Sequence, residues 1–305
     1  MNDLVSVIMN CHNGEKYLKQ AINSLLIQTY KNWELVFFDN CSTDNSYKII
    51  KSYKDKRIKY FNSQKKVGLG LARKLAYKRC SGTFISFLDC DDVWFKKKIN
   101  LQIKYFKNSK VGIVISNSLI FNSKRSSNLY KKEKIPTGAV FYKLLEKYFI
   151  SLDTVIIRKS FCDKLKTNFR SNYNIIHDLD LLTRLSKICL LDYCPKTLSK
   201  WRVHNYSDSF NKDKIINYEK KIFIKDITKI NKKDKKFLEA KKKFLEVIDI
   251  NESINYLIEN KRFYFIKKFL NSKFHYKYLI LLLFCMLPFG SYFFKRIYHY
   301  RKLYN

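Results

Sequence analysis

Short apolar runs alternate with amphipathic stretches along the first part of the chain. Four runs have the length and the aromatic and branched residues of buried strands, namely Leu4–Met9, Trp33–Phe38, Ile58–Phe61 and Phe84–Leu88. Between them, apolar residues recur at helical spacing in the stretches 15–28, 46–53 and 71–79. This alternation of strands and helices predicts a parallel α/β sheet with right-handed crossovers.

Polar residues follow three of these predicted strands directly. Asn10 follows the first strand, Asp39 the second and Asp89 the fourth. The carboxyl ends of parallel strands meet at one edge of a sheet, and ligands of open α/β sheets bind at that edge. The pattern therefore predicts a crevice of nucleotide size where these three residues lie.

The fourth strand ends in the acids Asp89, Asp91 and Asp92. Unpaired carboxylates are too costly to bury in a core, so they must lie near solvent or a cation. Asp89 and Asp91 are two residues apart and point the same way on an extended backbone. Such a pair suits Mg²⁺ or Mn²⁺, which completes its shell with phosphate oxygens and water. The alternative is a solvated acidic turn that caps the next helix.

The middle of the chain is less regular. Val111–Ser116 and Asp153–Arg158 are predicted strands, with a polar and basic loop between them at 123–134. The stretch 174–185 is typical of a helix start, and Asp180 is expected on the surface of that helix.

Five segments resemble, in the same order, the motifs of the family 2 glycosyltransferases, which have the GT-A fold. They are Ser6–Asn13, Gln28–Tyr30, Asp39–Asp44, Gly68–Arg73 and Phe87–Trp94. The resemblance is strong over about the first 110 residues and weaker to about residue 210. Each motif alone is weak evidence, but five in order are specific. The resemblance implies a mixed, mainly parallel Rossmann-like sheet flanked by helices.

The resemblance also implies a nucleotide-diphospho-sugar donor, commonly a UDP-sugar, on the N-terminal half of the sheet. Asn10, His12 and Asn13 would line the nucleotide, and Asp39 and Asn40 would contact the base. Asn40 stands where the family more often has Asp. An amide both donates and accepts hydrogen bonds, whereas an ionised carboxylate only accepts, so a base other than uracil stays open.

The same resemblance implies a phosphate and metal site. Arg73 would lie near the diphosphate, and Asp89 and Asp91 match the family's DxD motif, with Asp91 the better metal ligand. His204 would ligate the metal or contact the diphosphate. Cleavage of the bond between the anomeric carbon and the diphosphate builds negative charge on the leaving oxygens, which a divalent cation neutralises.

Family 2 enzymes invert the anomeric centre, so a general base must face the sugar opposite the diphosphate. Asp178 matches that base, although it would also stabilise the start of a helix without any catalytic role. His177 stands where the family often has Glu. The residues Trp201–Ser207 resemble the loop that closes the active site in many bacterial members of the family. His177, Trp201 and Arg202 are assigned to the acceptor side, with a solvated imidazole and a packed indole as the alternatives.

The composition changes after about residue 211. The predicted organisation is a catalytic domain at 1–210 with halves at 1–110 and 111–210, a basic helical extension at 211–275, and a hydrophobic segment at 276–305. Within that segment, Tyr278–Phe294 has no formally charged side chain. A straight helix of this length spans about 25 Å, less than the ~30 Å of a bilayer core. We expect an interfacial or re-entrant anchor, with a buried helix as the alternative.

The formal net charge of +35 is typical of proteins that bind nucleic acid or anionic membranes. No nucleic-acid-binding signature is present, so a membrane surface is the expected partner. The eight Cys residues have neither disulfide-framework nor zinc spacing, which indicates reduced thiols in the cytosol. The chain opens in a strand pattern, and no signal peptide is expected.

Together these patterns predict a cytoplasmic glycosyltransferase at the inner face of the cell membrane. It would transfer a sugar from a nucleotide-diphosphate donor to a hydroxyl of a glycan or lipid-linked acceptor, with inversion, in the biosynthesis of a cell-surface polysaccharide. A nucleotidyltransferase with a similar sheet is one alternative, and it would not need Asp178. A basic nucleic-acid-binding protein is the other alternative.

Overall fold

The computed structural model describes residues 3–131, 134–204, 212–271 and 276–287, and the single positions 290, 292, 294 and 298. The chain divides into two compact units. The first contains residues 1–144 and 148–203, and the second contains residues 145–147 and 204–305. The predicted domain boundaries near residues 110, 210 and 275 stay predictions.

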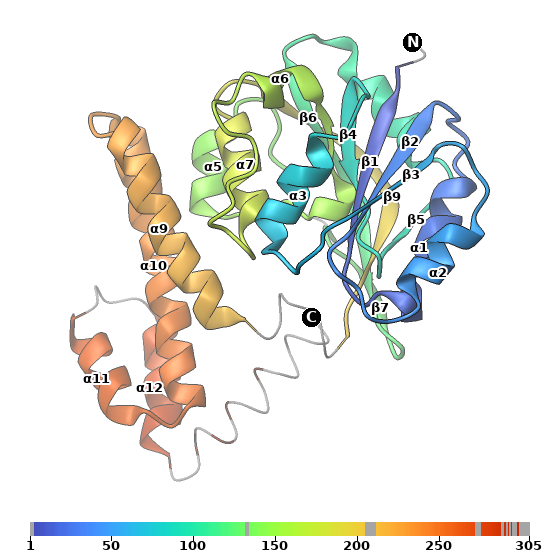
Figure 1. The fold of residues 1–305 in the computed structure, drawn as a ribbon. Coiled ribbons are helices and arrows are strands. Elements are labelled where there is room, and N and C mark those ends of the chain that lie inside the picture. Colours follow the sequence, from blue (N-terminus) through green and yellow to red (C-terminus); the bar gives the residue numbers. More distant parts are fainter. Residues whose placement is uncertain are drawn as a thin grey trace. The chain divides into compact units, whose positions relative to one another are not determined.

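The first unit is built on one sheet with the strand order β3-β2-β1-β4-β8-β6-β9-β5, and β7 pairs with β6. The strands are β1 Val5–Cys11, β2 Trp33–Asp39, β3 Ile58–Asn62, β4 Phe84–Phe87, β5 Val93–Trp94, β6 Val111–Phe121, β7 Ser126–Asn128, β8 Ile156–Arg158 and β9 Leu190–Arg202. β3, β2, β1 and β4 run parallel side by side (Figure 1), whereas β8 is antiparallel to both of its neighbours. The predicted GT-A sheet, mixed and mainly parallel, is confirmed.

Helices cover both faces of this sheet. Those before residue 204 are α1 Glu15–Leu26, α2 Ser46–Ser52, α3 Leu69–Tyr77, α4 Lys98–Gln102, α5 Phe141–Glu146, α6 Lys159–Asp163 and α7 His177–Leu185. Along β2, Val36 packs into the core that includes Ala72 of α3, whereas Leu35 packs into the core that includes Ile22 of α1. Burial on both faces explains why the strands are continuous apolar runs in the sequence.

Two local predictions were wrong, and one strand was not predicted. The strand without a prediction is β9, whose pairing with β6 passes from Cys194 to Thr197 and leaves Pro195 in a bulge. The predicted loop at 123–134 contains β7, which extends the sheet. The predicted strand at Asp153 begins instead with a 3₁₀ turn at Leu152–Thr154, and β8 follows it.

A buried lysine joins helix α4 to the 3₁₀ turn before β8. Lys98, at the start of α4, is fully buried, and its ammonium donates to Gln102 Oε1 and to the Thr154 carbonyl at 3.2 Å. The amide of Gln102 also donates to that carbonyl, at 2.7 Å. Burial lowers the pKa of Lys98 to about 7. The network therefore ties α4 to the 3₁₀ turn at Leu152–Thr154, and it depends on a lysine that loses its proton near neutral pH.

Lys98→Met is expected to reduce the pH dependence of stability. The unfolded lysine keeps its proton up to its ordinary pKa of 10.5, whereas the folded one releases it near 7, so the free energy of unfolding rises with pH between these values. We expect the gain between pH 7 and pH 9 to be about 2 kcal/mol larger in the wild type. Urea titrations of both proteins at both pH values measure this difference, and equal gains would contradict the prediction.

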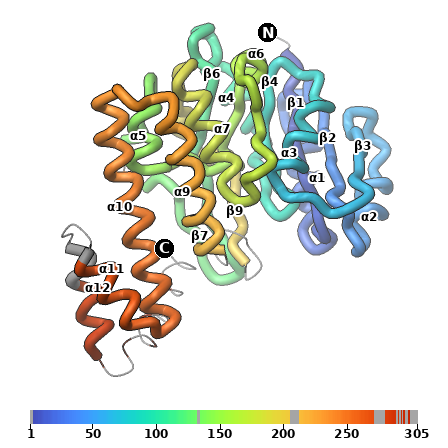
Figure 2. The backbone as a smooth tube through the Cα atoms, turned by 60° about the vertical axis from the view of Figure 1, so that its left-hand side comes forward, coloured from blue at the N-terminus to red at the C-terminus, as the bar shows by residue number. Residues whose placement is uncertain are grey.

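The second unit is helical, as the basic extension was predicted to be. Its helices are α9 Asp213–Ile230, α10 Lys235–Ile258, α11 Arg262–Asn271 and α12 Tyr276–Met286. α9 and α10 lie alongside each other (Figure 2), and the Asp234 side chain caps α10 by accepting the Phe237 N–H at 3.0 Å. A separate core is formed in part by Leu257, Phe265 and Leu281.

Within the described residues, no helix combines the length and the apolar character that crossing a bilayer requires. Part of the segment 276–305, where the anchor was predicted, lies outside the described residues.

Candidate active site

The ends of β1 and β2 bring the predicted nucleotide residues together. Asn10 is buried, and neither the nitrogen nor the oxygen of its amide has a hydrogen-bond partner. A buried polar group without a partner is a place where a ligand or water belongs. His12 contacts the Asn40 carbonyl through Nδ1 at 3.1 Å, and the Asn13 side chain accepts the Thr43 N–H at 2.8 Å. These two residues hold the loops after β1 and β2 against each other.

Asp39 and Asn40 have different surroundings. The carboxylate of Asp39 accepts the Ser42 N–H at 2.8 Å and the Tyr60 hydroxyl at 3.2 Å. The amide of Asn40 donates to the Val67 carbonyl at 2.8 Å and accepts the Val67 N–H at 3.0 Å. Asp at this position could not donate to Val67, which explains the amide. Asn40 therefore fixes the loop that leads into α3.

Arg73 and Asp89 form the central ion pair of the site. Arg73 extends from α3, is only 2% exposed, and donates through Nη2 to Asp89 Oδ1 at 2.8 Å. Its Nε is buried without a partner. Burial raises the pKa of Asp89, the charge of Arg73 opposes this, and the charges of Asp91 and Asp178 add to it. Asp89, Asp91 and Asp178 thus lie near enough to interact.

Arg202 binds the acidic turn through both its backbone and its side chain. Its backbone N–H donates to the buried carboxylate of Asp92 at 2.9 Å, and its Nε donates to the Asp91 carbonyl at 2.8 Å. Its guanidinium lies 4.3 Å from the ring centroid of Tyr17 and 4.5 Å from that of Phe121. Such stacking on two rings fixes a guanidinium in place. Sequence analysis placed Arg202 in a closing loop, whereas it ends strand β9.

The start of α7 places the predicted base beside the ion pair. The Tyr148 hydroxyl donates to Asp178 Oδ2 at 3.0 Å, and burial raises the pKa of Asp178. His177 is buried, and its Nδ1 has no partner. Burial, with help from the charge of Arg73, holds the pKa of His177 well below its ordinary value. The imidazole is therefore neutral at physiological pH.

The expectation that Asp180 lies on the helix surface was wrong. Asp180 has no exposed surface, and its carboxylate pairs with Arg184 at 2.5 Å and with Arg170 at 3.6 Å. The preceding loop packs over this face of α7, and two guanidinium groups compensate the buried charge. Asp180 is thus a structural residue.

Trp201 and His204 belong to different units of the structure. Trp201 is half-buried in β9 and pairs with Ile120 of β6. His204 lies in the second unit, whereas Asp89 and Asp91 lie in the first. The metal role of His204 stays a prediction, and the rest of the predicted closing loop, from residue 205, lies outside the described residues.

Sequence analysis missed two residues of this site. Tyr148 bonds Asp178 across thirty positions of sequence, and no local pattern marks it. Asp153 is buried, accepts the Ser118 hydroxyl at 2.5 Å, and raises the pKa of Asp89 and Asp92 by its charge. Asp153 is the only acid in the sequence between Glu146 and Asp163, and this was a signal that could have identified it.

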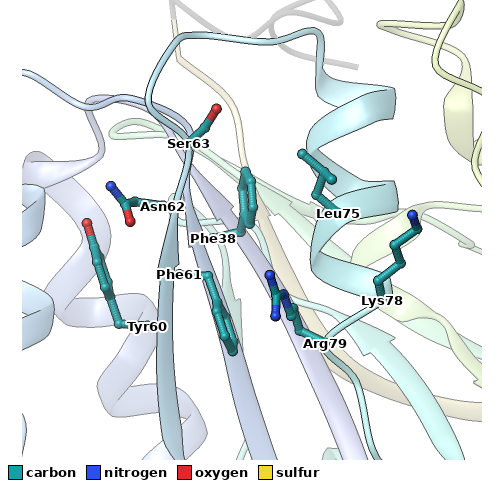
Figure 3. A pocket seen from close by; sticks show the side chains of 8 residues that line it. All are labelled: Phe38, Tyr60, Phe61, Asn62, Ser63, Leu75, Lys78 and Arg79. Atoms are coloured by element: carbon teal, nitrogen blue, oxygen red, sulfur yellow. The ribbon is translucent and has the colours of Figure 1, made fainter.

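A pocket of about 670 Å³ lies between β3 and α3 (Figure 3). Its lining residues are Phe38, Tyr60, Phe61, Asn62, Ser63, Leu75, Lys78 and Arg79. None of the predicted site residues lines it. Ser63 donates its N–H to the Asp39 carbonyl at 2.9 Å, so one end of the pocket adjoins the predicted base site.

Comparison with known proteins identifies the family. The model of "Glycosyl transferase family 2" matches residues 6–166. Among curated proteins, the UDP-Glc:alpha-D-GlcNAc-diphosphoundecaprenol beta-1,3-glucosyltransferase WfgD of Escherichia coli is 32% identical over 211 residues, which cover 69% of this chain and 81% of WfgD.

Two solved structures share the fold. S. aureus TarS 1-349 in complex with UDP matches with a TM-score of 0.65 and 18% identity, over 98% of this chain and 86% of that one. The mannosyltransferase PcManGT of Pyrobaculum calidifontis, in complex with GDP-Man and Mn²⁺, matches with a TM-score of 0.58 and 14% identity, over 97% and 84%.

Proposed function

The chain belongs to glycosyl transferase family 2 and is a glycosyltransferase, and we propose that it transfers a sugar from a UDP-sugar to a hydroxyl of a lipid-linked glycan, with inversion. The observation that carries the proposal is the ion pair of the buried Arg73 with the half-buried Asp89, with the charges of Asp91 and Asp178 near enough to affect the pKa of Asp89. The name of WfgD, which combines a UDP-sugar with a diphosphoundecaprenol acceptor, supports the choice of both substrates, and we place the product in polysaccharide biosynthesis.

The donor would bind where buried polar groups lack partners. The amide of Asn10 has a donor and an acceptor available for the nucleotide, at the junction of β1 and β2. The Nε–H of Arg73 is available for the donor, whereas its Nη2 already donates to Asp89. A guanidinium suits the planar, charged oxygens of a diphosphate. Asp39, held by Ser42 and Tyr60, lies at the base end.

A divalent cation fits the acidic turn. In the described parts of the chain, no three His, Cys, Asp or Glu side chains gather closely enough to hold a metal. Asp89 and Asp91 are hard oxygen donors, which suits Mn²⁺ or Mg²⁺ that takes further ligands from phosphate and water. When bound, the ion supplies Lewis-acid stabilisation of the departing diphosphate. PcManGT, which shares the fold, was solved with Mn²⁺.

Asp178 would act as the general base. Its carboxylate would take the proton of the acceptor hydroxyl as that oxygen attacks the anomeric carbon on the face opposite the diphosphate. Burial raises its pKa, which strengthens it as a base, and the Tyr148 hydroxyl fixes its orientation. The neutral His177, with Nδ1 available, would hydrogen-bond a sugar hydroxyl.

Tyr148→Phe is expected to move the acid limb of the pH–rate profile to higher pH. The Tyr148 hydroxyl lowers the pKa of Asp178, so its loss lets burial raise that pKa further. The base works as the carboxylate, and a higher pKa means that more of it is protonated at low pH. The measurement is kcat/KM between pH 4 and pH 8. An acid limb that stays in place would argue against this contact or against Asp178 as the base.

The second unit would bind the enzyme to the inner face of the cell membrane. α11 and α12 expose large apolar side chains, namely Phe263, Tyr264, Ile266, Leu270, Ile280, Leu283 and Met286. Exposed apolar side chains on basic helices are typical of interfacial binding to anionic lipid. We expect flotation with phosphatidylglycerol vesicles, weaker flotation with phosphatidylcholine, and a loss of binding in Leu270→Glu/Leu283→Glu. Equal flotation of that variant would contradict the assignment.

A donor screen tests the proposed function. UDP-sugars with Mn²⁺ are expected to raise the melting temperature, and the preferred donor is expected to release UDP when a lipid-linked glycan is added. NMR of the product gives the anomeric configuration. Stabilisation by GDP-sugars alone would overturn the donor, retention would overturn the mechanism, and release of pyrophosphate would indicate a nucleotidyltransferase instead.

A further inference from the structure

Two thiols of the site meet at one glycine. A Cβ on Gly14 would lie 2.8 Å from Cys11 Sγ and 2.9 Å from Cys90 Sγ, so both sulfurs pack against the same backbone. Cys11 is 1% exposed and Cys90 is half-buried, and both are free thiols. Only glycine at position 14 leaves room for this pair.

Cys11 is the last residue of β1, and Cys90 lies in the turn that follows β4, the parallel neighbour of β1. Because both sulfurs lie within 2.9 Å of the Cβ position that Gly14 leaves empty, they are at most about 5.7 Å apart. Two sulfurs this close on adjoining segments form a disulfide once the turn after β4 moves toward β1.

The two cysteines connect the acidic turn, which is proposed to hold the cation, with the end of β1, which is proposed to bind the nucleotide. Cys90 lies between Asp89 and Asp91, and Cys11 lies between Asn10 and His12. A covalent bond would bring the two sulfurs to about 2.05 Å and would pull the acidic turn toward β1. A misplacement of about 1 Å is enough to lower a rate by roughly 10²-fold.

We propose that Cys11 and Cys90 form a reversible disulfide that inactivates the enzyme under oxidising conditions. The oxidant is a small disulfide such as oxidised glutathione. Cys90, the more accessible of the two thiols, loses its proton and attacks one of the sulfurs of this oxidant, which forms a mixed disulfide and releases a thiolate that takes up the proton. The Cys11 thiolate then attacks the Cys90 sulfur and releases the second thiol. Two protein thiols are thereby oxidised and one small disulfide is reduced; a dithiol reverses both steps. The loss of activity rests on the proposed function, whereas the bond itself does not.

The test uses the full chain, reduced and then incubated folded with oxidised glutathione. Peptide mass spectrometry is expected to find a Cys11–Cys90 crosslink, and dithiothreitol is expected to remove it. Cys41, which is also half-buried near the site, provides the matched control, so Cys41→Ala is expected to form the same crosslink. Cys11→Ala is expected to stop at glutathione on Cys90, and Cys90→Ala is expected to form no crosslink. Glutathione that remains on wild-type Cys90 without a crosslink would overturn the proposal.

Two further readouts separate this proposal from the proposed function. Turnover of the donor is expected to fall at least tenfold on oxidation and to return with dithiothreitol. The stabilisation by UDP and Mn²⁺ in a melting experiment is expected to fall in parallel. Crosslinked protein that keeps full UDP stabilisation would overturn the inactivation, even if the donor or acceptor assignment failed.

Discussion

Asp178→Asn is expected to lower kcat by about 10³-fold while the affinity for UDP stays close to that of the wild type. The amide keeps the shape of the side chain and can still accept the hydrogen bond from Tyr148, but it cannot take a proton from the acceptor. The loss therefore falls on the chemical step. Steady-state kinetics give kcat and KM, and calorimetry with UDP gives the dissociation constant of UDP.

Asp180→Asn is the matched control, because it also replaces a carboxylate with an amide, two residues further along the same helix. Asp180 is fully buried and pairs with Arg184 and Arg170, so its variant is expected to lose stability, with little change in kcat for the protein that remains folded. If Asp178 only stabilised the start of α7, both variants would show this pattern. Equal losses of UDP affinity and rate in Asp178→Asn would remove it from the role of base.

The sequence predicted the half of the sheet whose strands are buried on both faces. β1, β2 and β4 are buried along their whole length. Such strands appear in the sequence as continuous apolar runs, which can be recognised without knowledge of the rest of the fold. The polar residues at their ends then mark the edge where ligands bind. The positions of Asn10, Asp39 and Asp89 in the chain therefore place the candidate site at one edge of the sheet, but they do not identify the hydrogen-bond partners of these residues.

The remaining features depend on contacts between distant parts of the chain. Arg202 contacts the acidic turn across more than a hundred positions, and its stacking between Tyr17 and Phe121 has no local signature. Asp180 looks like a surface acid because charged residues in a first helical turn are usually solvated, and only the loop packed over α7 buries it. Periodicity describes the two faces of one element, and it carries no information on which element will cover them.

Asp91→Ala is expected to lower Mn²⁺-dependent turnover by about 10²- to 10³-fold and to remove the Mn²⁺-dependent part of UDP binding. Asp89 pairs with Arg73 at 2.8 Å, and Asp91, the second acid of the motif that resembles DxD, is the residue proposed as the better metal ligand. The variant keeps the backbone carbonyl of Asp91, to which Arg202 Nε donates.

The measurements are turnover across a Mn²⁺ titration and the shift in melting temperature with UDP, with and without the metal. Asp55→Ala removes an acid that pairs with Arg57 away from the site, and it is expected to leave both readouts unchanged. Because a cation raises the apparent affinity for a diphosphate only when both are held at one place, the two readouts must fall together in Asp91→Ala. A variant that loses turnover but keeps Mn²⁺-dependent UDP binding would move the metal to other residues, and the acidic turn would then serve the fold alone.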